Sequence, residues 1–177
     1  PKKPANMLKN ILPREAGEVA IQFDDKNIYF TLSNYKMVCR QVEGRYPNYN
    51  AVIPEENPHK VIVDRLALIN ALKRVSVFSN QASNLIKLQV SENLIQISAQ
   101  DIDFSISAEE KVVCQYQSEA INIGFKSTFL IEILSNFESA EIIIELADAM
   151  RAGIFLPLED EENEELLMLL IPLMLND

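Results

Sequence analysis

Apolar residues recur at the spacing of one helix face in three stretches of the chain. An α-helix brings positions 0, 3, 4 and 7 to the same side, so we predict helices within residues 1–14, 64–78 and 126–137. Their first apolar members, Leu8, Leu68 and Leu130, are 60 and 62 residues apart. A near-constant step of this size indicates an internal repeat. The three faces are Leu8, Ile11 and Leu12; Leu68, Ala71, Leu72 and Val75; and Leu130, Ile133, Leu134 and Phe137.

Runs rich in β-branched and aromatic residues surround these helices and predict strands. One strand leads directly into the second and third helices, and three strands follow each helix. A complete unit is therefore β-α-β-β-β, and the first unit lacks its leading strand. The leading strands are residues 60–63 and 121–125; the others are residues 19–23, 27–32 and 35–42, residues 86–90, 94–99 and 104–113, and residues 141–146, 153–156 and 166–172.

The repeat predicts an α+β fold. Between Pro54 and Pro58 the acidic residues and prolines are typical of an exposed connector. We therefore divide the chain into residues 1–54, half of a domain, and residues 55–177, a whole domain built from two units. The acidic run Glu159–Glu165 lies between two predicted strands and is expected to form a solvated hairpin loop.

Basic residues concentrate in the predicted helices. The three stretches hold eight of the sixteen lysines and arginines but two of the twenty-six acidic residues, in a chain of net charge −10. If all helices line one surface, that surface attracts phosphate without reading sequence. Lysine and arginine are also good helix formers on any exposed helix, so the same pattern fits a plain solvated face.

The sequence offers little material for catalysis or cofactor binding. Its four glycines form no phosphate-binding loop, and one histidine, His59, is too few for a zinc site or a triad. We expect His59 to be a surface-loop residue. Cys39 and Cys114 lie far apart without a CxxC motif and are expected to be reduced, structural thiols of a cytosolic protein. We predict no enzyme activity, no metal site and no cofactor.

Paired carboxylates occur at predicted turns and strand ends, at Asp24-Asp25, at Asp101 with Asp103, and at Glu109-Glu110. Such pairs can bind a cation or transfer protons, but at these positions turn and edge roles are expected.

The C-terminal run Leu166–Leu175 stays apolar past Pro172. It is far shorter than the roughly 20 residues of a membrane-spanning helix, so no membrane association is predicted. Its leucines and methionines fit either a groove for a partner peptide or a fully buried last strand, and the sequence favours neither.

One longer motif resembles a known family. Residues Glu43-Gly44-Arg45-Tyr46-Pro47-Asn48-Tyr49-Asn50-Ala51-Val52-Ile53-Pro54 are similar to the signature of the bacterial DNA sliding clamps, the β subunit of the replicative polymerase. Further segments resemble the third domain of these clamps in order and spacing: Phe78-Ser79-Asn80, Val90-Ser91-Glu92-Asn93, Ile123-Gly124-Phe125-Lys126 and Ile171-Pro172-Leu173.

The resemblance implies a DNA-clamp fold of repeated β-α-β-β-β units, with helices on one face and antiparallel sheets on the other. The chain would cover the second half of the middle domain and the C-terminal domain. It implies a ring of two subunits around double-stranded DNA, bound without sequence preference. The bases expected to face DNA are Lys9, Arg14, Lys73, Arg74 and Lys126. Val77 and Phe78 are expected at the dimer seam.

The resemblance also implies a cleft between two domains that docks short linear motifs of the polymerase catalytic subunit, the clamp loader and repair proteins. Departures at Ala51, Ser83 and Met174 are expected to alter its polar rim. We therefore expect a cytoplasmic, non-catalytic processivity factor, and keep a repeat-built scaffold unrelated to DNA as the alternative. The cleft residues are Pro47, Val52, Phe129, Met150, Ala152, Ile171, Pro172, Leu173 and Met174.

Overall fold

The predicted helices form at the expected places in the computed structural model, which describes residues 1–159 and 164–175. Within these residues the α-helices are α1 (Lys2–Ile11), α2 (Arg65–Ser76) and α3 (Ser127–Ser135). Two short 3-10 helices are η1 (Leu12–Arg14) and η2 (Tyr49–Val52). The start of α2 is sharp because the Asp64 carboxylate accepts a hydrogen bond of 2.6 Å from the backbone N–H of Ala67. None of the helices in these residues is long and apolar enough to cross a membrane.

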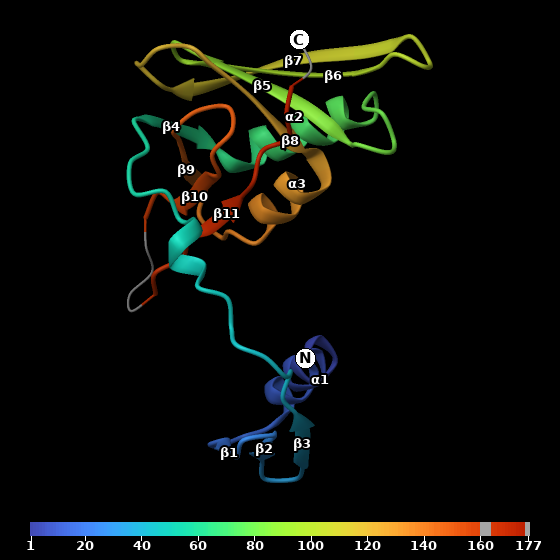
Figure 1. Cartoon of the computed structure of the whole chain (residues 1–177), viewed down its shortest axis with the longest axis vertical. Helices are drawn as coiled ribbons and strands as arrows, with labels where there is room; N and C mark the ends of the chain where they lie inside the picture. The colour runs from blue at the N-terminus through green and yellow to red at the C-terminus, as the bar shows by residue number, and fades with distance from the viewer. Residues whose placement is uncertain (160–163, 176–177) are drawn as a thin grey trace. The chain divides into compact units, whose positions relative to one another are not determined.

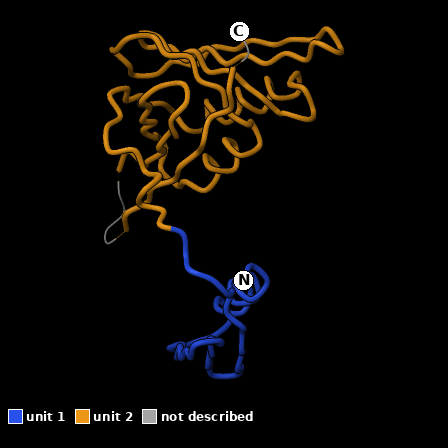
Figure 2. The backbone as a smooth tube through the Cα atoms, viewed as in Figure 1, with its two compact units in different colours: residues 1–47 blue, residues 48–177 orange. Residues whose placement is uncertain are grey.

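The chain divides into two compact units, residues 1–47 and residues 48–177 (Figure 2). Unit 1 contains α1, η1 and a three-stranded antiparallel sheet in the order β1-β2-β3. The assignment of residues 1–54 and 55–177 to two domains of a larger protein stays a prediction. The strands of unit 1 are β1 (Ala20–Phe23), β2 (Asn27–Thr31) and β3 (Lys36–Arg40).

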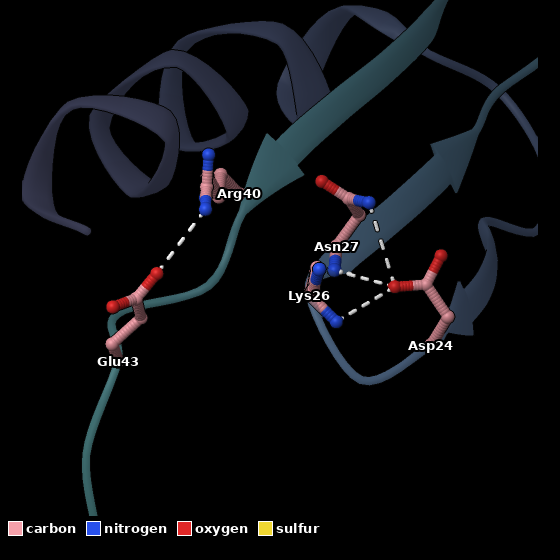
Figure 3. Close-up of polar contacts among 5 residues, drawn as sticks. All are labelled: Asp24, Lys26, Asn27, Arg40 and Glu43. Carbon is pink, nitrogen blue, oxygen red and sulfur yellow. Dashed lines mark hydrogen bonds and ion pairs between the residues drawn. The ribbon is translucent and has the colours of Figure 1, made fainter.

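The turn between β1 and β2 is organised by Asp24, as Figure 3 shows. One carboxylate oxygen of Asp24 accepts the backbone N–H groups of Lys26 and Asn27, each at 2.7 Å. These hydrogen bonds to the ionised form, first that of Lys26, lower the pKa of Asp24. The turn role expected for this acidic residue is confirmed.

Unit 2 is built on one eight-stranded sheet in the order β11-β10-β9-β4-β7-β6-β5-β8. It contains two complete β-α-β-β-β repeats, β4-α2-β5-β6-β7 and β8-α3-β9-β10-β11, as predicted (Figure 1). The strands are β4 (His59–Asp64), β5 (Leu85–Ser91), β6 (Leu94–Asp101), β7 (Ile106–Gln115), β8 (Ile121–Lys126), β9 (Glu141–Leu146), β10 (Gly153–Pro157) and β11 (Met168–Leu170).

The leading strand of each repeat pairs with a strand of the other repeat. β4 lies between β7 of its own repeat and β9 of the other, with Val61 opposite Ile144. β8 pairs with β5 of the preceding repeat, with Ile123 opposite Leu88. Each repeat therefore completes the sheet of the other, and the two fold as one unit.

The core of unit 2 lies between the helices and the inner face of the sheet. α2 buries Leu68, Leu72 and Val75, and α3, which packs against α2, buries Leu130 and Leu134. Burial alternates along β5 and β6, which places every second side chain against the helices. The helical spacing in the sequence thus identified the buried face of both helices.

Two expectations about single segments are wrong. His59 is the first residue of β4 and is half-buried, because its ring contacts the buried Tyr116. The last strand is shorter than residues 166–172: β11 ends at Leu170, and Pro172 beyond it has no backbone N–H to donate to a ladder. The predicted acidic loop falls largely on residues 160–163, outside the described residues, between the antiparallel strands β10 and β11.

Candidate functional site

The C-terminal segment beyond β11 is attached to β8. The backbone N–H of Leu173 donates to the carbonyl oxygen of Gly124 at 2.8 Å, which forms an isolated antiparallel bridge. Figure 1 shows this red segment leaving β11 and passing along β8. A Cβ at Gly124 would lie 2.7 Å from the carbonyl oxygen of Leu173, so only glycine allows this close approach.

Large apolar side chains point to solvent along this segment. Ile171 is 69% exposed and Met174 is 75% exposed, whereas Pro172 and Leu173 between them are half-buried. The run is therefore not a fully buried last strand, and of the two alternatives the exposed apolar surface fits better.

Other residues of the predicted cleft lie on elements that precede or contact β11, or in the β9–β10 connection. Ala152 immediately precedes Gly153, which pairs with Leu170 at the end of β11. Phe129, half exposed, lies on α3, the helix that contacts β11. Met150, in the β9–β10 connection two residues before Ala152, is also exposed. Unit 2 thus carries exposed apolar groups on three elements: the segment after β11, α3 and the β9–β10 connection.

Two predicted cleft residues lie on neither β11, α3 nor the β9–β10 connection. Val52 is exposed in η2, in the connector before β4, and Pro47 is the exposed last residue of unit 1. Their participation in a common cleft stays a prediction.

The loop that carries Met150 is held by an acid–base pair. Asp148 accepts the backbone N–H groups of Met150 and Arg151, each at 2.8 Å, and the Nε of Arg151 donates to its second oxygen at 2.7 Å. The hydrogen bond from Arg151 is the main cause that lowers the pKa of Asp148 to about 2. The ionised carboxylate therefore shapes the loop at ordinary pH.

The basic residues predicted to face DNA have different surroundings. Lys9 in the last turn of α1, Arg14 in η1 and Lys73 in α2 are exposed. Arg74 forms an ion pair with Glu110 on β7. The ammonium of Lys126 lies 5.0 Å from the ring centre of Phe129, a cation–π contact. Arg74 and Lys126 thus have partners within the protein.

Val77 and Phe78, predicted at a dimer seam, follow the last turn of α2. Both side chains are exposed, and the N–H of Phe78 donates to the carbonyl oxygen of Val75 at 3.0 Å. The structure leaves these two neighbouring apolar groups at the surface of unit 2.

The two cysteines and Asp101, whose side chains could in principle react or bind a cation, are buried within the protein. Cys39 and Cys114 are free and buried, and burial raises the pKa of the Cys114 thiol. The carboxylate of Asp101 is buried and accepts the backbone N–H of Asp103 at 3.0 Å. The expectations for structural thiols and for a local role of Asp101 are therefore confirmed.

Sequence reasoning missed Gly124 as a residue that positions others, and the turn or edge role expected for Glu109 and Glu110 is wrong, because both lie inside the central strand β7. Glycine inside a strand signals a close backbone approach, and this signal was available at Gly124. No comparable local signal marks Glu110, because its partner Arg74 is 36 residues away in sequence.

The profile of the family described as "DNA polymerase III beta subunit, C-terminal domain" matches residues 50–172. The beta sliding clamp of Treponema pallidum is 31% identical over 140 residues, 77% of this chain and 38% of the relative. That of Pseudomonas aeruginosa is 26% identical and is matched over 99% of this chain and 47% of the relative. The chain thus spans less than half the length of these relatives.

Solved structures agree with these matches. A DNA polymerase sliding clamp from Pseudomonas aeruginosa with a ligand superposes with a TM-score of 0.92 at 26% identity, over 99% of this chain and 47% of that one. A sliding clamp (DNA polymerase III subunit beta) from Bartonella birtlesii, bound to griselimycin, gives 0.91 at 31% identity, over 99% and 46%. The repeats, the fold and the matched length agree, and the chain belongs to the DNA polymerase III beta subunit family of sliding clamps.

Proposed function

We propose that the chain is part of a processivity factor: a non-catalytic, ring-forming sliding clamp that encircles double-stranded DNA and tethers DNA polymerase, clamp loader and repair proteins. The similarity to sliding clamps along 99% of the chain carries this proposal. Two subunits of the longer protein would close the ring, with Val77 and Phe78 at the seam, in the cytoplasm. Topological enclosure makes a tight grip on DNA unnecessary, which agrees with a net charge of −10.

The exposed apolar group of unit 2 is the proposed docking site for linear peptide motifs. Ile171, Met174, Phe129 and Met150 offer apolar contact area at the surface, where a peptide with leucine and phenylalanine anchors would bury it. The structure of the Bartonella birtlesii clamp bound to griselimycin supports ligand binding by this fold. A few anchors on an open surface give modest affinity.

A fluorescent peptide of the Gln-Leu-x-Leu-Phe type tests the site by anisotropy. Ile171→Ala and Met174→Ala should each weaken binding by about tenfold, the usual effect of truncating a central anchor. Val113→Ala is the matched control, because Val113 is 77% exposed on β7, a different element of the unit. Unchanged binding in Ile171→Ala and Met174→Ala, or an equal loss in Val113→Ala, would contradict this site.

DNA encirclement is tested with the full-length protein that carries this chain. After loading at low salt, a ring should stay on circular DNA and run off linear DNA. Equal loss from circular and linear DNA would contradict the clamp function and favour the scaffold alternative.

A further inference from the structure

Arg74 and Glu110 meet side by side on the helix-covered face of unit 2. Nε of Arg74 donates to Oε2 of Glu110 at 3.0 Å, and Nη2 donates to Oε1, so the guanidinium fork binds both carboxylate oxygens. This arrangement joins the last turn of α2 to the middle of β7. It uses the same donors that a guanidinium offers to a phosphate.

Glu110 occupies a position that the strand pattern assigns to apolar residues. Burial alternates along β7, so Glu110 shares its face with the buried Val112 and Cys114, and its partner across the ladder is the buried Ile97. A carboxylate next to a core is costly unless it is paired. Arg74 supplies that pairing: its hydrogen bond lowers the pKa of Glu110 and raises that of Arg74.

Two other basic residues near the helices of unit 2, Arg65 and Lys126, also contact groups within the protein. Nε of Arg65 donates to the carbonyl oxygen of Ser139 at 2.7 Å, and Nη1 to that of Leu134 at 3.4 Å, in the last turn of α3. Lys126 lies over the ring of Phe129. Lys73, exposed next to Arg74, forms no ion pair among the described residues. The face therefore presents less available positive charge than its sequence suggests.

We infer that Glu110 occupies the guanidinium of Arg74 in place of a DNA phosphate and thereby weakens the grip of α2 on DNA. A phosphate can take the same two donors only by displacing the carboxylate. Weak, easily broken contacts allow a ring to move along the duplex, so Glu110 sets the strength of contact. The inference rests on the proposed function, because it takes the helices of unit 2 to face DNA.

Two neutralising variants separate this pairing from net charge. Glu110→Gln frees Arg74, whereas Glu109→Gln changes the net charge equally on the opposite face of β7, where Glu109 is exposed. Binding of a short labelled duplex is followed by anisotropy over a salt series, and by NMR of the Arg74 Nε–H. Glu110→Gln should bind about tenfold more tightly at low salt, the effect of one added charge-assisted contact. Its log–log salt dependence should steepen by about 0.9, whereas that of Glu109→Gln should change little.

Variants of Arg74 test the inference from the other side. Combined with Glu110→Gln, Arg74→Ala should abolish the gain in DNA binding. Equal gains from Glu109→Gln and Glu110→Gln, or a gain that survives Arg74→Ala, would overturn the inference and leave the proposed function intact. Absence of binding by Glu110→Gln, with folded spectra, would also overturn the inference, whereas the proposed function is tested separately by retention on circular DNA.

Discussion

The backbone N–H of Leu173 is bonded to the carbonyl oxygen of Gly124 at 2.8 Å, which joins the C-terminal segment to β8. Without this bridge, β8 would be an open edge at one end of the eight-stranded sheet, and the apolar side chains around Leu173 would lose their support. The proposed peptide site is thus held in place by a backbone contact that only glycine permits.

Gly124→Ala should displace the C-terminal segment. The added methyl would lie 2.7 Å from the carbonyl oxygen of Leu173 and 2.8 Å from the Leu175 side chain. We expect a loss of about 1–3 kcal/mol in the free energy of unfolding, typical of overpacking, together with weaker peptide binding. Hydrogen exchange at the Leu173 amide measures the displacement directly. Asn122→Ala, an exposed position on the same strand, is the control, and unchanged Leu173 exchange in Gly124→Ala would contradict the prediction.

Stability should depend on pH through Asp148. Its pKa is lowered to about 2 in the folded protein, first by the hydrogen bond from Arg151, and lies below the ordinary value of 3.8. Its stabilising contribution is therefore complete above the unfolded value and is lost as pH falls from about 4 towards about 2. Asp148→Asn and Arg151→Gln should each reduce the difference between melting temperatures measured at pH 5 and pH 2.5. If both variants kept the parent's full pH dependence, other carboxylates would account for it.

Much of unit 2 followed from periodicity alone. Leu68, Ala71, Leu72 and Val75 were identified as one helix face by their spacing, and all four are buried in α2. The strand ranges were correct to within a few residues because alternation and turn residues are local signals.

The order in which the strands pair could not be predicted from the sequence. Alternation shows which side chains of β4 face the core, but it carries no information on whether β4 pairs with β9 or with another strand. Side-chain contacts such as Arg74 with Glu110 and His59 with Tyr116 could not be predicted either, because the two partners lie far apart in the sequence. His59 was misplaced because a proline-rich neighbourhood suggested a loop, while a buried hydroxyl 57 residues away holds it at the start of a strand.

The hydroxyl of Tyr116 should contribute to stability through two contacts. Oη donates to the carbonyl oxygen of Glu119, so its contact of 2.6 Å with His59 requires the Nδ1–H of His59 to be the donor. Tyr116→Phe removes the hydroxyl from both contacts at a buried position and should lower the free energy of unfolding by about 1–3 kcal/mol. Urea unfolding of Tyr116→Phe, His59→Ala and the double variant measures the coupling. Strictly additive effects would show that the two side chains do not stabilise each other.

Val77 and Phe78 should hold the proposed dimer of the full-length protein together. Val77 is 73% exposed and Phe78 is 37% exposed, and neither side chain belongs to the buried core of unit 2. In a subunit interface their replacement by aspartate would bury unpaired charges, at a cost of several kcal/mol. Val77→Asp combined with Phe78→Asp should therefore convert the dimer to monomers in sedimentation velocity, whereas Val113→Asp should not. A dimer that survives the double change, with unchanged melting of the subunit, would place the seam on another surface of the protein.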